Sequence, residues 1–245
     1  MNFLKLRETN VREKQITSRK AFFAISKIPL IYVQKCFNFA YNMTFNKKGE
    51  HRSYRSGGMH QRRNGEIFAN TFLGKLCEFA VYSELSIKYE INEPDLSEWD
   101  LGKWDDVDFT IFDKTISVKS TKYFGNLLLL EKKDWSPTGG YLPNGDKHYD
   151  FTFLVRIKND PETLMKKNRI LYSDSLQKDD LWEIFKNNSW EYDIPGFITL
   201  EELVFLINNG YIIEQGDLLN GTTPMDATNY YCQAGDMHDI NDFLL

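Results

Sequence analysis

The chain has 245 residues, of which 42% are hydrophobic and 15% aromatic, and it carries a net charge of −5. This composition allows a sizeable buried core, and the length predicts a single domain over residues 1–245. A membrane protein is excluded, because no run approaches the roughly 18 apolar residues that span a bilayer, and residues 1–8 are charged rather than an apolar signal region. Three widely spaced cysteines indicate reduced thiols in the cytoplasm and form no zinc motif.

Helical patterns occur in four parts of the chain. Apolar residues at helical spacing predict a helix over residues 71–85 with one face toward a core. A capping box at Thr199 opens a helix that ends at Asn209-Gly210. The other two helical regions are residues 16–44, which proline divides near Pro29, and residues 181–187.

Strand patterns lie between these helices. Residues 151–157 are strongly apolar, which predicts a strand at the centre of a sheet. Residues 107–112 and 115–119 alternate apolar with polar residues, which predicts two strands joined by a short turn. Short strands are also expected at residues 87–91 and 211–213. With the helices, these strands predict a mixed α/β fold in which helices flank a central mixed β-sheet.

The two strands at residues 107–119 carry the most informative polar residues. A turn at Asp113-Lys114 places Asp108 opposite Lys119. Thr110 and Ser117 lie on the same face, because side chains repeat every two residues along a strand. The opposite face is apolar, so the polar face predicts a small site. The alternative is an ordinary cross-strand ion pair worth about a few tenths of a kcal/mol.

The turn itself leaves a second alternative open. Asp113-Lys114 lacks the glycine that a two-residue primed turn prefers, so a four-residue loop in the same register is also possible. Glu78 is equally open to two interpretations. It lies at the border of the apolar face of the helix over residues 71–85, where it is either an edge residue or a carboxylate aimed into a site.

A helix with Glu78, then a strand with Asp108, then a returning strand with Lys119 is an order that resembles the PD-(D/E)xK nuclease superfamily, and within it the type II restriction endonucleases. The resemblance covers roughly residues 70–125 and extends loosely to the strand at 151–157. It implies a restriction-endonuclease-like catalytic core over residues 70–158, with elaborations at 1–66 and 159–245. It also implies a homodimer that cuts double-stranded DNA at specific sites with Mg²⁺.

The resemblance assigns a role to each matching residue. Asp108 and Glu78 supply metal-binding carboxylates, and the backbone carbonyl of Val118 also contacts the metal. Lys119 orients or deprotonates the attacking water and offsets the charge that develops on the phosphate. Mg²⁺ suits this set, because it prefers oxygen ligands and often uses only one or two carboxylates with water and substrate phosphate.

The chain departs from the family pattern at two positions. Val107 precedes Asp108 where proline is frequent, and Ser117 stands where the family has a second acid. The missing charge comes either from Glu78, which we favour, or from Glu131, twelve residues after Lys119. Asp106 is a rival to Asp108, because it points to the same face two residues earlier.

The charge distribution is asymmetric. Residues 1–66 hold fourteen Lys and Arg against four Glu, whereas residues 67–245 hold sixteen Lys and Arg against thirty-one Asp and Glu. This pattern predicts a basic surface on an acidic body. Residues 47–65 form its densest part and are expected to contact the phosphate backbone, although a solvated connection is the simpler alternative. The candidate DNA-binding residues are Arg52, Arg55, Gln61, Arg62, Arg63 and, in the catalytic core, Lys122.

Three other functions stay open at this level. One is a nuclease of the same superfamily with a repair, phage or junction-resolving role and no tight sequence specificity. Another is a DNA-binding module with a decayed catalytic site, which Ser117 in the acid position motivates. The third is a structural or interaction protein in which Asp108 and Lys119 form an ordinary salt bridge.

Overall fold

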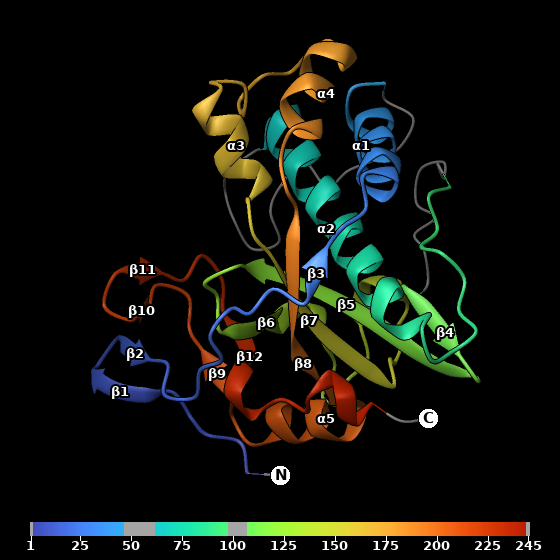
Figure 1. Ribbon diagram of the computed structural model, residues 1–245. Coiled ribbons are helices and arrows are strands. Elements are labelled where there is room, and N and C mark those ends of the chain that lie inside the picture. Colours follow the sequence, from blue (N-terminus) through green and yellow to red (C-terminus); the bar gives the residue numbers. More distant parts are fainter. Residues whose placement is uncertain (1, 47–61, 98–106, 244–245) are drawn as a thin grey trace.

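A mixed five-stranded sheet forms the centre of the protein (Figure 1). The computed structural model describes residues 2–46, 62–97 and 107–243. Strands β5 and β7 run parallel, and the other neighbouring strands of this sheet are antiparallel. The fold is therefore mixed α/β, as predicted. In spatial order the strands are β3 (Ser26–Lys27), β8 (Glu191–Thr199), β7 (Phe151–Ile157), β5 (Lys114–Lys122) and β4 (Phe109–Ile111).

Helices cover one face of this sheet, on the upper side of Figure 1. Long apolar side chains from these helices pack on the face of β7 that carries Phe153, Val155 and Ile157. Burial of this apolar surface is the main stabilising contribution of the layer. The helices are α1 (Leu30–Thr44), α2 (Asn64–Leu85), α3 (Pro161–Lys167) and α4 (Lys178–Lys186).

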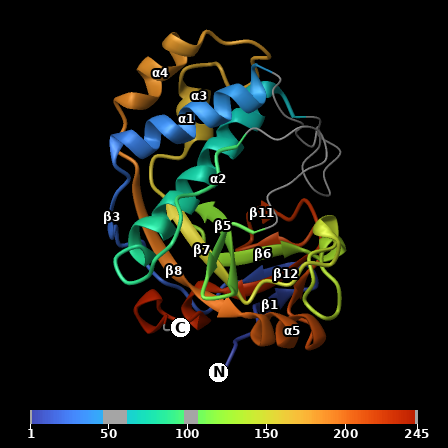
Figure 2. The ribbon, with the colours of Figure 1, turned by 90° about the vertical axis from the view of Figure 1, so that its right-hand side faces the viewer.

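A second sheet and one helix cover the other face, which carries Leu154 and Ile198. On this side the covering layer consists mostly of strands (Figures 1 and 2). The covering elements are β6 (Leu127–Glu131), β12 (Asn229–Gln233), β9 (Ile212–Ile213) and α5 (Leu200–Asn208). The central sheet therefore separates two hydrophobic cores.

A small third sheet joins distant parts of the chain. Its strands β2 and β10 are parallel, and each also pairs with an antiparallel neighbour. The strands are β1 (Arg7–Asn10), β2 (Glu13–Gln15), β10 (Leu218–Leu219) and β11 (Thr223–Pro224). Four 3₁₀ turns complete the described structure: η1 (Lys132–Asp134), η2 (Leu142–Asn144), η3 (Ala234–Asp236) and η4 (Ile240–Asp242).

The β4–β5 hairpin exists, but its register differs from the prediction. Ile111 pairs with Lys114, so the turn residues are Phe112 and Asp113 rather than Asp113 and Lys114. Both turn residues have positive φ, 45° and 64°, as a two-residue primed turn requires. The shift is two residues, so the two faces of the hairpin keep their predicted composition.

Several other elements can be compared with their predictions. The capping box at Thr199 is present and opens α5, and β7 occupies the centre of the sheet. Residues 16–29 were predicted to be helical, but they contain only the short strand β3, and the helix begins after Pro29. Residues 87–91 form a turn and irregular structure instead of the expected strand.

Within the described ranges, none of the helices combines the length and the apolar character needed to cross a membrane.

Candidate functional site

The turn between β5 and β6 brings Lys119 and Glu131 to the same place. Lys119 lies four residues before Tyr123, and Glu131 lies five residues after Asn126. The chain reverses between them, so β6 returns against the face of the central sheet on which the Lys119 side chain lies. Two residues that are twelve positions apart thereby line one pocket.

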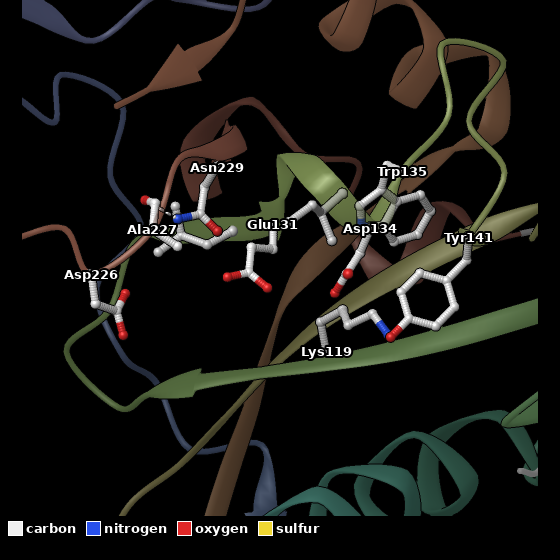
Figure 3. A pocket seen from close by; sticks show the side chains of 10 residues that line it. Lys119, Glu131, Asp134, Trp135, Tyr141, Asp226, Ala227 and Asn229 are labelled. Atoms are coloured by element: carbon white, nitrogen blue, oxygen red, sulfur yellow. Dashed lines mark hydrogen bonds between the residues drawn. The ribbon is translucent and has the colours of Figure 1, made fainter. Parts of the chain in front are cut away.

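This pocket has a volume of about 390 Å³ and is open to solvent on one side (Figure 3). Its floor is Lys119 from β5, and Trp135 and Tyr141 form an aromatic wall. The carboxylates of Glu131 and Asp134 point into the space between these residues. The remaining lining residues are Leu129, Leu130, Asp226, Ala227 and Asn229.

Glu131 is a largely enclosed carboxylate of this pocket. Its side chain is 10% exposed, and Lys133 Nζ lies 3.7 Å from Oε2. A buried carboxylate needs nearby positive charge or hydrogen bonds to remain ionised. Lys133, whose side chain is 58% exposed, contributes to this stabilisation.

Asp108 lies on the same face of the sheet as Lys119. The register of β4 and β5 continues so that Asp108 is opposite Ser117 rather than opposite Lys119. The carboxylate accepts a hydrogen bond of 2.6 Å from the Val118 amide. Because N–H and C=O of one strand residue point the same way, the Val118 carbonyl also faces this edge. Asp108 and this carbonyl therefore lie at the same edge of β5, but Asp108 is not among the residues that line the pocket with Lys119.

Ser117 is 2% exposed and does not line the pocket. Asp106, the rival to Asp108, lies outside the described residues.

Glu78 is not brought to this site. It belongs to α2, on the face of the central sheet opposite the pocket, and its carboxylate pairs with Lys75 at 2.8 Å. Both side chains are largely buried between α2 and α1, where Lys75 lies over the ring of Phe39. Of the two acids, Glu131 therefore lines the pocket with Lys119 and Glu78 does not, and which of them replaces the missing acid stays a prediction. The helical pattern identified a buried glutamate but could not tell which face of the sheet its helix covers.

The predicted DNA-binding residues that the structure describes are engaged within the protein. Arg63 Nη1 lies 2.7 Å from Asp174, and Lys122 Nζ lies within 3.5 Å of acids at the start of α3. Both side chains remain partly exposed, and Arg62 is half-buried. Such exposed ion pairs are weak and can exchange for phosphate. Arg52, Arg55 and Gln61 lie outside the described residues.

Several residues of the pocket were not predicted from the sequence. Asp134 and Tyr141 belong to the long β6–β7 connection, and Asp226 and Asn229 come from the strand region near the C-terminus. The apolar run of residues 127–130, which ends in Glu131, was the available signal for β6. No local pattern predicts that β12 pairs with β6, since the paired residues, such as Asn229 and Glu131, lie far apart in the sequence.

The donor set of the pocket suits a hard cation. Glu131, Asp134 and Asp226 provide carboxylate oxygens, and Mg²⁺ often needs only one or two of them with water. Among the residues that the structure describes, no three His, Cys, Asp or Glu side chains form a ready metal cluster. Carboxylate oxygens are the ligands that Mg²⁺ prefers, and Glu131 is the sequence-predicted acid among those that line the pocket.

Comparisons with protein-family models, with curated proteins and with solved structures find no match for this chain. The resemblance to the PD-(D/E)xK superfamily therefore rests on the residues and geometry described above.

Proposed function

We propose that this protein is a Mg²⁺-dependent endonuclease of the type II restriction kind, with Asp108, Lys119 and Glu131 as its catalytic residues. The observation that carries this proposal is the pocket that Lys119 and Glu131 share, with Asp108 on the same face of the sheet. A lysine beside enclosed carboxylates is the combination that phosphodiester hydrolysis requires: two acids for the metal and one cation for the reacting groups.

Each residue would have a distinct role. Glu131 and Asp108, with the Val118 carbonyl, would hold the metal, which neutralises phosphate charge and lowers the pKa of bound water when it is present. Lys119 would orient the attacking water and offset the charge of the transition state. A P–O bond forms to the water oxygen, the P–O bond to the leaving oxygen breaks, and one water proton passes to that oxygen.

The proposed substrate is double-stranded DNA. The excess of Lys and Arg in residues 1–66 supports this choice, because phosphate contacts dominate nonspecific affinity for DNA. Site-specific cutting of a palindromic sequence would require a homodimer, since a two-fold symmetric protein matches a symmetric site. The homodimer and the cytoplasmic location remain predictions.

One observation favours a second candidate, a DNA-binding module without catalysis. Ser117 is buried in the position of the second acid, so the site depends on Glu131 alone to replace it. Such a module would bind DNA and would hydrolyse nothing with any divalent metal.

Digestion of a large plasmid and a phage genome tests the proposal. We expect discrete fragments with Mg²⁺, none with EDTA, and a loss of cleavage of at least about 100-fold in Lys119→Ala. Lys166→Ala is the matched control, because Lys166 is an exposed lysine on α3 and is absent from the lining of the pocket. A metal-dependent smear would indicate a nonspecific nuclease. No cleavage by the wild type, with retained gel shifts, would indicate the DNA-binding module.

A further inference from the structure

Tyr141 faces the proposed catalytic lysine. The Nζ atom of Lys119 lies 5.5 Å from the centroid of the Tyr141 ring, within the range of a cation–π interaction. The two side chains come from different elements, β5 and the β6–β7 connection, and meet across the pocket (Figure 3). Their contact is therefore a tertiary feature and not a consequence of local chain geometry.

Hydrogen bonds and ring packing hold the β6–β7 connection in place around Tyr141. The Tyr141 amide donates to the carbonyl of Lys147 at 2.7 Å, and the Lys147 amide donates back at 3.2 Å. Trp135, which is 4% exposed, packs its ring 5.2 Å from the Tyr141 ring. A long connection held in this way has little freedom to move the ring away from Lys119.

Glycine at position 140 allows the connection to pass close to Asp146. A Cβ at Gly140 would lie 1.9 Å from the carboxylate of Asp146 and 2.8 Å from its backbone carbonyl oxygen, so a larger residue requires the chain around Asp146 to shift. The Gly140 amide also donates to Ser136 Oγ at 3.0 Å, and its carbonyl accepts from the Ser136 amide at 2.8 Å. Both backbone groups of Gly140, the residue immediately before Tyr141, are thus hydrogen-bonded to Ser136.

We propose that Tyr141 is a positioning residue that holds the Lys119 ammonium against its ring during DNA hydrolysis, an inference that rests on the proposed nuclease function. The pocket contains several carboxylates. If the Lys119 ammonium formed an ion pair with one of them, it would move away from the position of the reacting phosphate. An aromatic face attracts the ammonium without neutralising it or occupying a metal ligand. Tyr141 therefore keeps the charge of Lys119 available at a fixed place.

The test compares Tyr141→Leu and Tyr141→Phe in the full chain, with cleavage of plasmid DNA measured as kcat and KM. We expect Tyr141→Leu to lower kcat roughly tenfold with little change in KM, and Tyr141→Phe to stay within about threefold of wild type. Tyr172→Leu is the control, because Tyr172 is 62% exposed and lies outside the pocket.

A fluorine series separates positioning from packing. Phenylalanines with one, two and three ring fluorines at position 141 keep the ring shape but progressively weaken its attraction for a cation. We expect log kcat to fall stepwise along this series. A flat series, or equal losses in Tyr141→Leu and Tyr141→Phe, would overturn the proposal.

A second readout does not depend on cleavage. Urea midpoints are measured for wild type, Lys119→Met, Tyr141→Leu and the double variant. The Lys119–Tyr141 contact predicts that the double variant loses less than the sum of the two single losses. Additive losses would rule out the contact. Absence of all cleavage by the wild type would instead overturn the nuclease function, and the positioning role with it, whatever the urea cycle shows.

Discussion

At the scale of single residues, Arg156 shows how a charge is accommodated inside the central sheet. It is 1% exposed and forms a two-pronged ion pair with Asp193. Its remaining N–H groups donate to the carbonyls of Lys20, Ala21 and Gly125. All five donors of the guanidinium are used. Because Gly125 lies in the turn between β5 and β6, Arg156 also fixes the turn that brings Glu131 to Lys119.

Replacement of Arg156 tests this role. We expect Arg156→Met to lower the free energy of unfolding by about 3–5 kcal/mol, because Asp193 is left buried without its partner. The double variant Arg156→Met with Asp193→Leu should lose less than the single variant, since no buried charge remains. Urea denaturation measures both. A double variant that is less stable than Arg156→Met would contradict this account.

The residues of the site were only partly predictable. Alternation along β5 placed Lys119 on a polar face, and the register error did not change that face, because the shift was two residues. The choice between Glu78 and Glu131 needed information that no local pattern holds. Glu78 lies on a helix whose side of the sheet is decided by packing, and Glu131 reaches the site only because the chain reverses after β5.

At the scale of elements, the β4–β5 hairpin has an unusual turn. Phe112 adopts φ of 45° although it is a bulky residue, and the residue is 72% exposed. Asp150 holds the first residues of β5 in place, because it accepts hydrogen bonds from Thr115 and Lys114. Burial acts to raise the pKa of Asp150, but these hydrogen bonds outweigh it and hold that pKa below its ordinary value.

The turn can be improved. Phe112→Asn with Asp113→Gly installs the residues that favour positive φ at both positions. We expect a gain of about 1 kcal/mol, seen as a rise in Tm of about 2–4 °C for a chain of this size. The control is Asp113→Pro, which cannot adopt φ of 64° and should destabilise the hairpin. A fall in Tm for the Asn-Gly variant would argue against the two-residue turn.

Elements whose own residues all favour one structure, such as α5 and β7, were predicted from the sequence, whereas β8 was not. The capping box of α5 and the apolar run of β7 identify their elements directly. Strand β8 contains Pro195 and Gly196, which normally end a strand. They are tolerated because the β7–β8 pairing shifts register between Leu154 and Arg156. Glycine is also needed at position 196, because a Cβ there would lie 2.2 Å from the His238 carbonyl oxygen. Strand β8 is therefore explained by its contacts with β7 and with His238, which are distant in the sequence.

At the scale of the whole molecule, two hydrophobic cores share one sheet. Phe153 and Leu154 are adjacent on β7 and fully buried, but they belong to opposite cores. Both chain ends lie on the lower side of the molecule in Figure 1, and strands from the two ends meet in the third sheet. These pairings join residues about two hundred positions apart, so no window of sequence predicts them.

The shared sheet predicts that the two cores unfold together. Phe153→Ala and Leu154→Ala should each lower the free energy of unfolding by about 2–5 kcal/mol. Each variant should still unfold in one transition, with the same midpoint by circular dichroism and by tryptophan fluorescence. Two separate transitions, with only one moved by each substitution, would show that the cores are independent.

The most direct test of the proposed function compares Glu131→Gln with Glu78→Gln in Mg²⁺-dependent cleavage of DNA. Both replacements keep the size of a buried glutamate and remove its charge, so each serves as a control for the other. We predict that Glu131→Gln loses at least about 100-fold in kcat, whereas Glu78→Gln stays within about threefold of wild type. Full cleavage by Glu131→Gln, with loss in Glu78→Gln, would contradict the site that we assign between β5 and β6.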